Sequence, residues 1–183
     1  MSGWEQVLAE VVRTRRAALV GYACLFALNR IDGEDLVQEA LVRTFARRRS
    51  FADARAAEGY LRAAIRTSFL DRARRGKSSA GRAHLFLMED ARGPESSVPA
   101  VIDVRAALAV LAPRERACVV LRFFDDLSVA DIAGELGLSE GAVKRYLSDA
   151  TTKLRAQLGE PVSWSAAQGQ VARVSVIGEG RVS

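Results

Sequence analysis

The 183-residue sequence contains few of the residues that build disulfides or metal sites. Its two cysteines, Cys24 and Cys118, lie far apart in apolar segments, and we expect both to be buried free thiols. The single histidine, His84, has no histidine or cysteine neighbour at the spacing of metal ligands, so we expect no metal. Neither a glycine-rich phosphate loop nor a nucleophile–base arrangement occurs. We therefore predict no cofactor and no enzymatic activity.

Long apolar runs are missing too, although 49% of the residues are hydrophobic. No stretch approaches the ~20 consecutive apolar residues that a membrane-spanning helix needs, so we expect no membrane insertion. The first residues, 1–6, lack the basic region and the apolar stretch of a secretory signal. The composition predicts a cytoplasmic protein with a packed core.

The charge balance is only mildly basic, with 27 lysines and arginines against 22 acids and a net charge of +5. A partner has to be inferred from where the cations cluster rather than from their sum. Arginine outnumbers lysine, which suits phosphate and guanine contacts because a guanidinium donates two parallel hydrogen bonds. A biased composition would produce the same preference.

One segment, residues 128–147, has the pattern of a helix-turn-helix. The small Ala133 permits close approach of two helices, and Gly137 suits the left-handed end of the first helix. Val143 then packs the second helix back against the first. The other members of this apolar seam are Ile132, Leu136, Leu138, Leu147 and Leu154.

Both helices of this motif have start signals. Ser128 with Asp131 resembles a capping box, and Ser139 is placed to cap the second helix. An ordinary helical hairpin with a solvated basic face is the plainer alternative, but this spacing with two caps favours DNA binding. In such a motif the N-terminal half of the second helix meets base edges in the major groove. Its polar face carries Lys144, Arg145, Ser148, Thr151 and Arg155.

In the first half, the pattern is helical from residue 4 to about residue 28, and residues 29–33 have the composition of a turn. A helix is predicted over 34–49, followed by a loop over 50–59. Acidic residues lie in the first turn of the 34–49 helix and arginines in its last turn, which complements the helix dipole. One of its faces carries Asp35, Gln38, Glu39 and Val42, and charge pattern alone favours a solvated surface there.

A basic helix is predicted over residues 60–75. Between Tyr60 and Arg82 the sequence has seven cations and one acid, Asp71. An aromatic residue beside such charge, with a loop upstream, is how single-stranded nucleic acid is held. An ordinary helix with a basic end would have the same composition. Composition therefore does not decide between this interpretation and nucleic-acid binding. The cations are Arg62, Arg66, Arg72, Arg74, Arg75, Lys77 and Arg82.

The chain divides into two helical units, residues 1–75 and 102–158. Residues 76–101 have the composition of a flexible linker with a short apolar cluster, Leu85–Met88, and the tail 159–183 is predicted to be flexible or, less favoured, a docking segment. An extended linker could reach ~80 Å, which exceeds the ~34 Å repeat of B-form DNA. We predict an all-α fold of two small helical bundles joined by this linker.

Motifs in both halves support a family resemblance. The first half contains Glu34-Asp-Leu-Val-Gln-Glu-Ala40, Tyr60-Leu-Arg-Ala-Ala-Ile-Arg66 and Leu70-Asp-Arg-Ala-Arg-Arg75. The second half contains Leu111-Ala-Pro-Arg-Glu-Arg-Ala117 and the helix-turn-helix from Leu127 to Lys144. Over about residues 17–158 the sequence therefore resembles the extracytoplasmic-function sigma factors of bacterial RNA polymerase. The resemblance implies a sigma region 2-like first domain and a sigma region 4-like second domain.

The resemblance also implies a function in transcription initiation without chemistry of its own. Such a protein directs core polymerase to specific promoters and promotes strand opening. The implied partners are core RNA polymerase, through its β′ clamp helices and β subunit, promoter DNA and an anti-sigma factor, in the cytoplasm and at the nucleoid with the polymerase. Carried over by position, the core-binding residues are Asp35, Gln38, Glu39 and Val42.

The same resemblance assigns two DNA surfaces and implies that the loop 50–59 holds a flipped minus-ten base. The sequence departs from the family at Tyr60, often Trp, which can still stack, and at Thr67, often Asn, which lacks the amide. The implied minus-ten residues are Ser50, Phe51, Asp53, Tyr60, Arg62, Arg66, Thr67 and Arg74. The implied minus-thirty-five residues are Ser139, Glu140, Lys144, Arg145, Ser148 and Thr152.

The alternative hypothesis is a stand-alone helix-turn-helix regulator whose first half senses a ligand or dimerises. Such a regulator would bind duplex operator DNA without polymerase. A sigma factor is instead expected to bind promoters weakly when free and strongly as holoenzyme.

Overall fold

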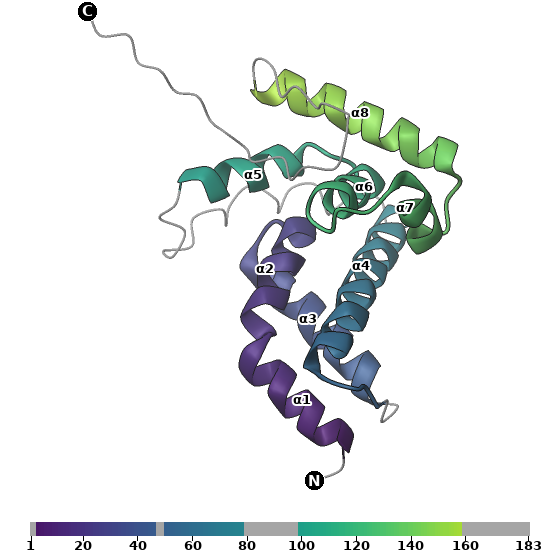
Figure 1. Ribbon diagram of the computed structural model, residues 1–183. Helices are drawn as coiled ribbons and strands as arrows, with labels where there is room; N and C mark the ends of the chain where they lie inside the picture. Colours follow the sequence, from purple (N-terminus) through teal and green to yellow (C-terminus); the bar gives the residue numbers. More distant parts are fainter. Residues whose placement is uncertain (1–2, 47–49, 79–98, 159–183) are drawn as a thin grey trace, which may run out of the picture.

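The computed structural model describes residues 3–46, 50–78 and 99–158. Over these residues the regular structure is entirely α-helical, so the predicted all-α class is confirmed (Figure 1). His84, the apolar cluster Leu85–Met88 and the tail 159–183 lie outside the described residues. The helices are α1 (Gly3–Thr14), α2 (Arg16–Ala27), α3 (Arg30–Phe45), α4 (Ala54–Ser78), α5 (Pro99–Ala109), α6 (Pro113–Phe123), α7 (Val129–Leu136) and α8 (Glu140–Leu158).

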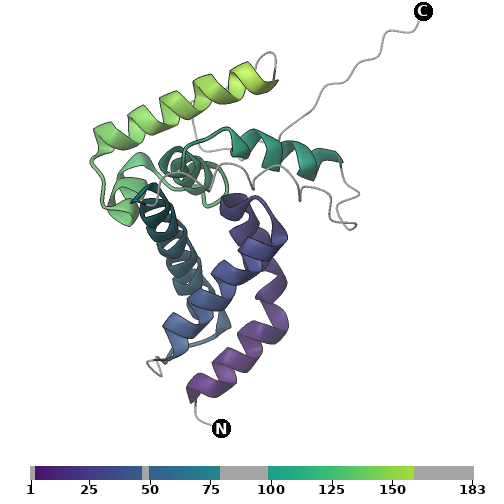
Figure 2. The same cartoon turned by 180° about the vertical axis from the view of Figure 1, so that it is seen from behind.

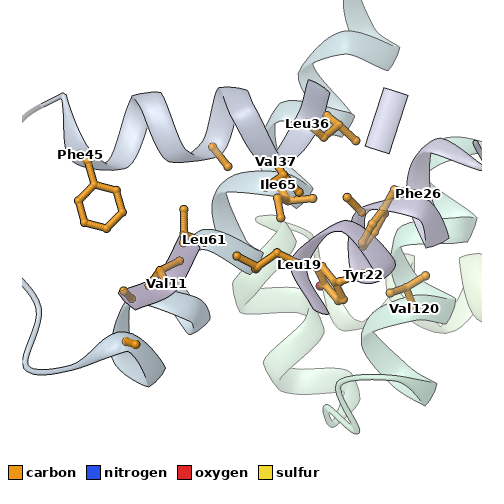
Figure 3. Packing of buried hydrophobic residues seen from close by; sticks show 14 of the residues in the cluster. Val11, Leu19, Tyr22, Phe26, Leu36, Val37, Phe45, Leu61, Ile65 and Val120 are labelled. Carbon is orange, nitrogen blue, oxygen red and sulfur yellow. The ribbon is translucent and has the colours of Figure 1, made fainter. Parts of the chain in front are cut away.

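Helices α1 to α4 form the first bundle, around the long helix α4. Leu61 and Ile65 project from α4 into a core that also holds Leu19 and Phe26 of α2 and Val37 of α3 (Figure 3). Each of these side chains is at most 2% exposed, and burying a side chain of this size contributes about 1.5–3 kcal/mol. The core therefore fixes the orientation of both α3 and α4, whose outer faces carry candidate functional residues.

Helix α3 starts earlier than predicted, because residues 29–33 are its first turn rather than a separate turn. The Asn29 side chain caps the helix, with its carbonyl oxygen accepting from the backbone N–H of Asp32 at 2.8 Å. Gly33 allows α3 to pack closely against α2, since a Cβ at this position would lie 2.8 Å from the sulfur of Cys24. The glycine that suggested a turn instead lets α3 approach α2.

The predicted loop over 50–59 is also shorter than expected, because α4 already begins at Ala54. The Asp53 carboxylate accepts from the backbone N–H of Ala56 at 2.7 Å and so satisfies an N–H at the start of the helix. Ala54 and Ala57 are buried in the first core. Residues 54–59 therefore belong to the helix, and the loop keeps only its first part.

Helices α5 to α8 form the second bundle, and α7 and α8 are the predicted helix-turn-helix. Ser128 and Asp131 form the expected capping box, and Gly137 ends α7 in the left-handed region with φ 60°. Val143 is fully buried in the core between the two helices. Pro113 opens α6, as its sequence position indicated. The capping box, the left-handed glycine and the buried valine of this motif are confirmed, whereas Leu154 of the predicted seam packs in the core with α5 and α6.

The two bundles are in contact, which the sequence did not indicate (Figures 1 and 2). Ala117 and Val120 of α6 lie in the first core beside Phe26. The buried guanidinium of Arg116 donates to the backbone oxygen of Phe26 and to those of Leu108 and Leu111, the latter two at 3.0 and 3.1 Å. Burial lowers the pKa of Arg116 to about 10, so the group stays charged at neutral pH. Arg116 thus ties α6 to the end of α2.

Candidate functional site

The outer face of α3 holds the candidate polymerase-binding residues in two different states. Asp35, Gln38 and Val42 are exposed, and Val42 retains 57% of its accessible surface. Glu39 is instead bonded to α4: its carboxylate accepts from Ser68 at 3.0 Å and from Arg72 at 2.8 Å. Although partial burial opposes it, the hydrogen bonds from Arg72 and Ser68 hold the pKa of Glu39 below its ordinary value. Three of the four residues therefore make an open face, and Glu39 fixes that face to α4.

Aromatic side chains line the segment that leads into α4. The rings of Phe45 and Phe51 are 5.7 Å apart, and those of Phe51 and Tyr60 are 5.6 Å apart. Tyr60 is 40% exposed and Ser50 is exposed, whereas Asp53 caps the helix. Ring contacts at these distances hold Tyr60 in place while leaving part of its side chain open to a stacking base.

Further along α4, the candidate cations differ sharply in exposure. The Arg74 side chain is 75% exposed and pairs with Asp71 on the same helix, at 3.0 Å. Arg66 is 7% exposed, and the Arg62 side chain is about one-third exposed. Thr67 is exposed and donates to the backbone oxygen of Ala63. The predicted strand-binding residues thus share a helix, but two of them are covered.

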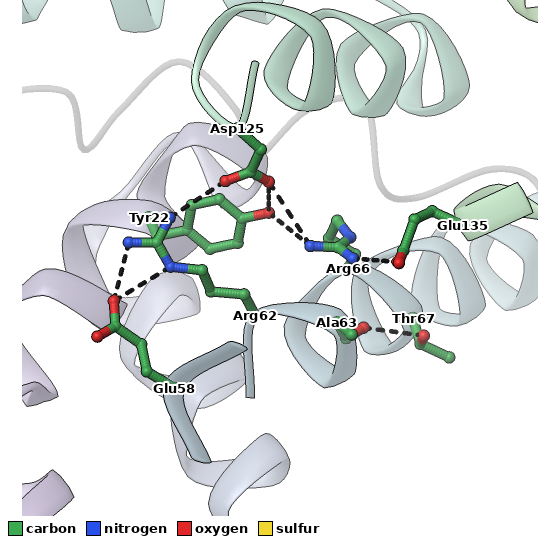
Figure 4. Close-up of polar contacts among 8 residues, drawn as sticks. All are labelled: Tyr22, Glu58, Arg62, Ala63, Arg66, Thr67, Asp125 and Glu135. Atoms are coloured by element: carbon green, nitrogen blue, oxygen red, sulfur yellow. Dashed lines mark hydrogen bonds and ion pairs between the residues drawn. The ribbon is translucent and has the colours of Figure 1, made fainter. Parts of the chain in front are cut away.

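Both bundles supply the cover (Figure 4): within the first bundle Arg62 donates to Glu58 at 2.9 Å and Arg66 donates to the Tyr22 hydroxyl at 3.1 Å, and the second bundle adds two carboxylates. Asp125, in the turn after α6, accepts from the Tyr22 hydroxyl at 2.7 Å and from Arg62 at 3.1 Å. Arg66 lies 3.6 Å from the same carboxylate and forms an ion pair with Glu135 of α7. Burial of Tyr22 raises the pKa of its phenol, and the Asp125 carboxylate adds to the rise, so Tyr22 remains a neutral donor.

The outer face of α8 is open by comparison. The Ser139 hydroxyl accepts from the backbone N–H of Ala142 at 3.2 Å, so it caps α8 as predicted. The Arg145 guanidinium lies 5.4 Å from the centre of the Tyr146 ring. The candidate residues Glu140, Lys144, Arg145, Ser148 and Thr152 are all exposed along this helix. Together they present a polar, partly basic surface on one helix, the kind of element that the major groove of DNA admits.

The sequence analysis missed Tyr22, Asp125, Glu135 and Arg116. Each acts across the contact between the bundles, on a residue far away in the sequence. A run such as Arg-Glu-Arg at 114–116 does not reveal that one of its arginines is buried against backbone oxygens.

The described residues give no sign of a metal centre or a membrane span. No group of His, Cys, Asp and Glu residues among them is placed to hold a metal ion. None of the helices in the described ranges is both long and apolar enough to cross a bilayer. Cys24 and Cys118 are buried free thiols, as expected, and burial raises the pKa of both; that of Cys118 rises to about 11.

Comparison with known protein families matches each bundle separately. Residues 11–79 match the family model for sigma-70 region 2, and residues 102–154 match that for sigma-70 region 4. The two matches follow the same division as the two helical bundles. The class that fold and sites define is therefore a sigma-70 type transcription initiation factor.

Curated relatives show which sigma-70 type factors the chain is similar to. The chain is 35% identical over 152 residues to the RNA polymerase sigma-E factor of Streptomyces coelicolor, covering 81% of this chain and 84% of the relative. It is 32% identical over 152 residues to the ECF RNA polymerase sigma factor SigL of Mycobacterium tuberculosis, covering 79% of this chain and 84% of that one.

A solved structure of a sigma factor is also similar to this chain. The sigma factor RpoE of Bartonella quintana, solved in complex with the anti-sigma factor NepR, superposes with a TM-score of 0.61 at 25% identity. The alignment covers 82% of this chain and 94% of RpoE.

The chain belongs to the extracytoplasmic-function sigma factors of RNA polymerase. It is a DNA-binding transcription initiation factor that directs core polymerase to promoters. The alternative of a stand-alone regulator gains no support, because the first half matches sigma-70 region 2.

Proposed function

We propose that this sigma factor divides its work among three surfaces, on α3, α4 and α8. The exposed face of α3 binds core polymerase, the start of α4 holds the single-stranded minus-ten element, and α8 binds the minus-thirty-five duplex. The observation that carries the proposal is the capped helix-turn-helix with Lys144 and Arg145 exposed on α8, in a chain that also contains region 2. The protein acts by binding, without catalysing a reaction.

On α3, the protruding side chains of Asp35, Gln38 and Val42 are proposed to contact the β′ clamp helices, with further contacts to the β subunit. An acid, an amide and an apolar group side by side suit an interface with a polar rim and a small apolar centre. Glu39 contributes differently, because its bonds to Arg72 and Ser68 orient α3 relative to α4. Because this surface is proposed to bind the polymerase, the protein is proposed to act in the cytoplasm.

On α4, the proposed minus-ten site combines stacking with charge. Tyr60 offers a ring for an unstacked base, and Ser50 and Phe51 line the approach. Arg62, Arg66 and Arg74 supply guanidinium groups along one helix for the phosphates of the strand. Holding unstacked bases and backbone together favours the open form of the promoter.

An anti-sigma factor is the proposed regulatory partner. The Bartonella quintana relative was solved with one, and this chain has apolar side chains that such a partner could cover. Ile31 is 66% exposed and Phe124 is 49% exposed. They lie on different bundles, so one partner touching both would hold the bundles together.

The proposal is tested with the purified chain and core RNA polymerase. We expect the two to co-elute in gel filtration and to give run-off transcripts from genomic promoters that core enzyme alone does not transcribe. Asp35→Arg should weaken co-elution, while the matched control Glu10→Arg, an exposed acid on α1, should not. A chain that fails to co-elute, yet binds duplex operators unaided, would contradict the proposal.

A further inference from the structure

Helix α8, which carries the proposed minus-thirty-five surface, is held by the other helices of its bundle. It lies across α5, α6 and α7 (Figure 1). Its first half packs on α7 through the fully buried Val143, and its second half packs on α5 and α6 through Ala150 and Leu154. Apolar contacts of this kind are non-directional, so by themselves they permit a small rotation of the helix about its own axis.

A directional contact also joins α8 to α6. The Lys153 ammonium donates to both carboxylate oxygens of Glu115, at 2.8 Å each. Glu115 is only 6% exposed, and one of these oxygens also accepts from the backbone N–H of Ala112 at 2.8 Å. The carboxylate is therefore fixed at the start of α6, and through its charge-assisted hydrogen bonds it fixes the ammonium of α8 in turn.

Lys153 lies on a different side of α8 from the proposed DNA contacts. With 3.6 residues per turn, it stands about 180° around the helix from Lys144 and about 140° from Ser148. Its ammonium is directed to α6, whereas Lys144 and Ser148 lie on the exposed outer face. The pair with Glu115 therefore holds α8 from behind the surface that meets the groove.

A small rotation of α8 would affect base contacts more than phosphate contacts. A helix with its side chains has a radius of ~5–6 Å, so a rotation of ~15° would move a side-chain tip by roughly 1.5 Å. Hydrogen bonds to base edges need donor–acceptor distances of about 2.7–3.2 Å, and such a shift would break them. Attraction to a phosphate depends mainly on charge and tolerates the shift better. Whatever fixes the rotation of α8 therefore controls sequence discrimination.

We propose that the Glu115–Lys153 pair fixes the rotation of α8 in the major groove, so that both are positioning residues for discrimination of the minus-thirty-five sequence. The inference rests on the proposed binding of this element by α8. A charged pair with one buried partner suits this role, because polar groups between packed helices set their register where apolar groups do not. Lys153 thus acts on DNA recognition without touching DNA.

The test uses holoenzyme and a promoter obtained from the run-off assay, with its minus-thirty-five element either intact or substituted at one base pair at a time. Quantitative footprinting gives the ratio of the two affinities, which measures discrimination. Repeating it at several salt concentrations gives the salt slope, which counts phosphate contacts. Lys153→Met removes the ammonium and keeps an unbranched side chain, whereas Lys153→Arg keeps a cation. The matched control Arg13→Met removes the same charge from an exposed site on α1.

We expect Lys153→Met to lower the affinity ratio roughly fivefold, as for one weakened base contact, with the salt slope of the wild type. Lys153→Arg should restore the ratio, and Arg13→Met should change neither quantity. Lys144→Met, on the outer face, serves as the comparison for a DNA contact and should reduce the salt slope by about one.

Two results would overturn the inference. An equal loss of affinity for intact and substituted elements would mean that the pair only stabilises the bundle. A salt slope reduced as in Lys144→Met, with unchanged discrimination, would make Lys153 a phosphate contact instead.

Glu115→Gln examines the other partner of the pair. It should lower the affinity ratio in the same way, and adding Lys153→Met to it should cause little further loss, because both changes remove one interaction. An additive loss would contradict the pairing. Should Glu115→Gln fail to fold in a circular dichroism melt, Lys153→Met decides alone, since the Lys153 side chain is 45% exposed.

The wild-type measurement separates this inference from the proposed function. Wild-type holoenzyme that binds intact and substituted elements equally would count against the proposed role of α8. Normal discrimination by the wild type, together with the same ratio for Lys153→Met, would count against the positioning role alone.

Discussion

The two proposed DNA surfaces, on α8 and on α4, differ in what their cations contact. On α8, Lys144 and Arg145 are exposed on the outer face of a helix whose position is set by two caps and a buried valine. On α4, Arg62 is paired with Glu58 of the same helix and with Asp125 of the other bundle, and Arg66 is paired with Glu135 of the other bundle. One surface is ready for DNA in the free chain, and the other is already neutralised.

This difference follows from the kind of DNA that each surface is proposed to bind. Duplex DNA is always present, so an exposed recognition helix costs little and gives only weak binding on its own. A surface for unpaired strands would capture any single-stranded nucleic acid, because stacking and backbone charge are sequence-tolerant. The ion pairs of Arg62 and Arg66 would limit that capture.

The largest expected effect comes from removing the guanidinium that joins the bundles. Arg116→Ala leaves the backbone oxygens of Phe26, Leu108 and Leu111 buried without their donor, and we expect a loss of roughly 3 kcal/mol in the free energy of unfolding. Urea denaturation measures this loss. The control Arg114→Ala removes an exposed arginine from the same helix and should change stability by less than about 0.5 kcal/mol. Equal effects of both variants would show that the buried contacts contribute little.

The next largest effect is expected for the exposed surface of α8. Arg145→Ala should weaken protection of the minus-thirty-five element by holoenzyme by about 1–3 kcal/mol, or roughly tenfold to a hundredfold, if Arg145 contacts a base edge or a phosphate. Footprinting at several enzyme concentrations gives the affinity. Arg13→Ala, which removes the same charge from an exposed site on α1, should leave the footprint as it is. An unaltered footprint with Arg145→Ala would remove this residue from the α8 surface.

A smaller effect is expected for the aromatic part of the covered surface. Tyr60→Ala should slow strand opening by roughly fivefold, because base–aromatic stacking is worth about 1 kcal/mol or more per base. Permanganate reactivity of melted thymines measures the opening rate, and initial binding should change less. Tyr60→Phe keeps the ring and should open promoters normally. Normal opening by the alanine variant would mean that no base stacks there.

The sequence was sufficient for features that depend on neighbouring residues. The all-α class, the caps at Ser128 and Ser139, the left-handed Gly137 and the start of α6 at Pro113 each follow from a local pattern. Two of the boundary differences, at Asn29 and Asp53, have one cause. The segments that contain Asn29 and Asp53 were interpreted as a turn and a loop, but each of these residues caps the helix that begins directly after it.

The features that sequence reasoning missed depend on the contact between the bundles. Nothing near Asp125 in the sequence indicates that it faces Tyr22, 103 residues away. Glu39 was expected on an open face, and only the packing of α3 against α4 places Arg72 beside it. Local patterns predict which side chains point outward from a helix, whereas the partner that meets them is set by the tertiary arrangement.

The smallest effect is expected for Glu39, whose ion pair with Arg72 lies within one bundle rather than between the two bundles. The pKa of Glu39 lies below its ordinary value of 4.5, because Arg72 and Ser68 outweigh its partial burial. A carboxylate with a lowered pKa in the folded state contributes stability above its unfolded pKa, and the contribution is lost as the pH falls through the folded value. Glu39→Gln should therefore cost less than about 1 kcal/mol at neutral pH and almost nothing at a pH well below 4.5. Urea denaturation across this range measures the difference, with Glu10→Gln, which removes an exposed acid from α1, as the control. If the cost of Glu39→Gln were the same at both ends of the range, the pair with Arg72 would not be what stabilises the α3–α4 contact.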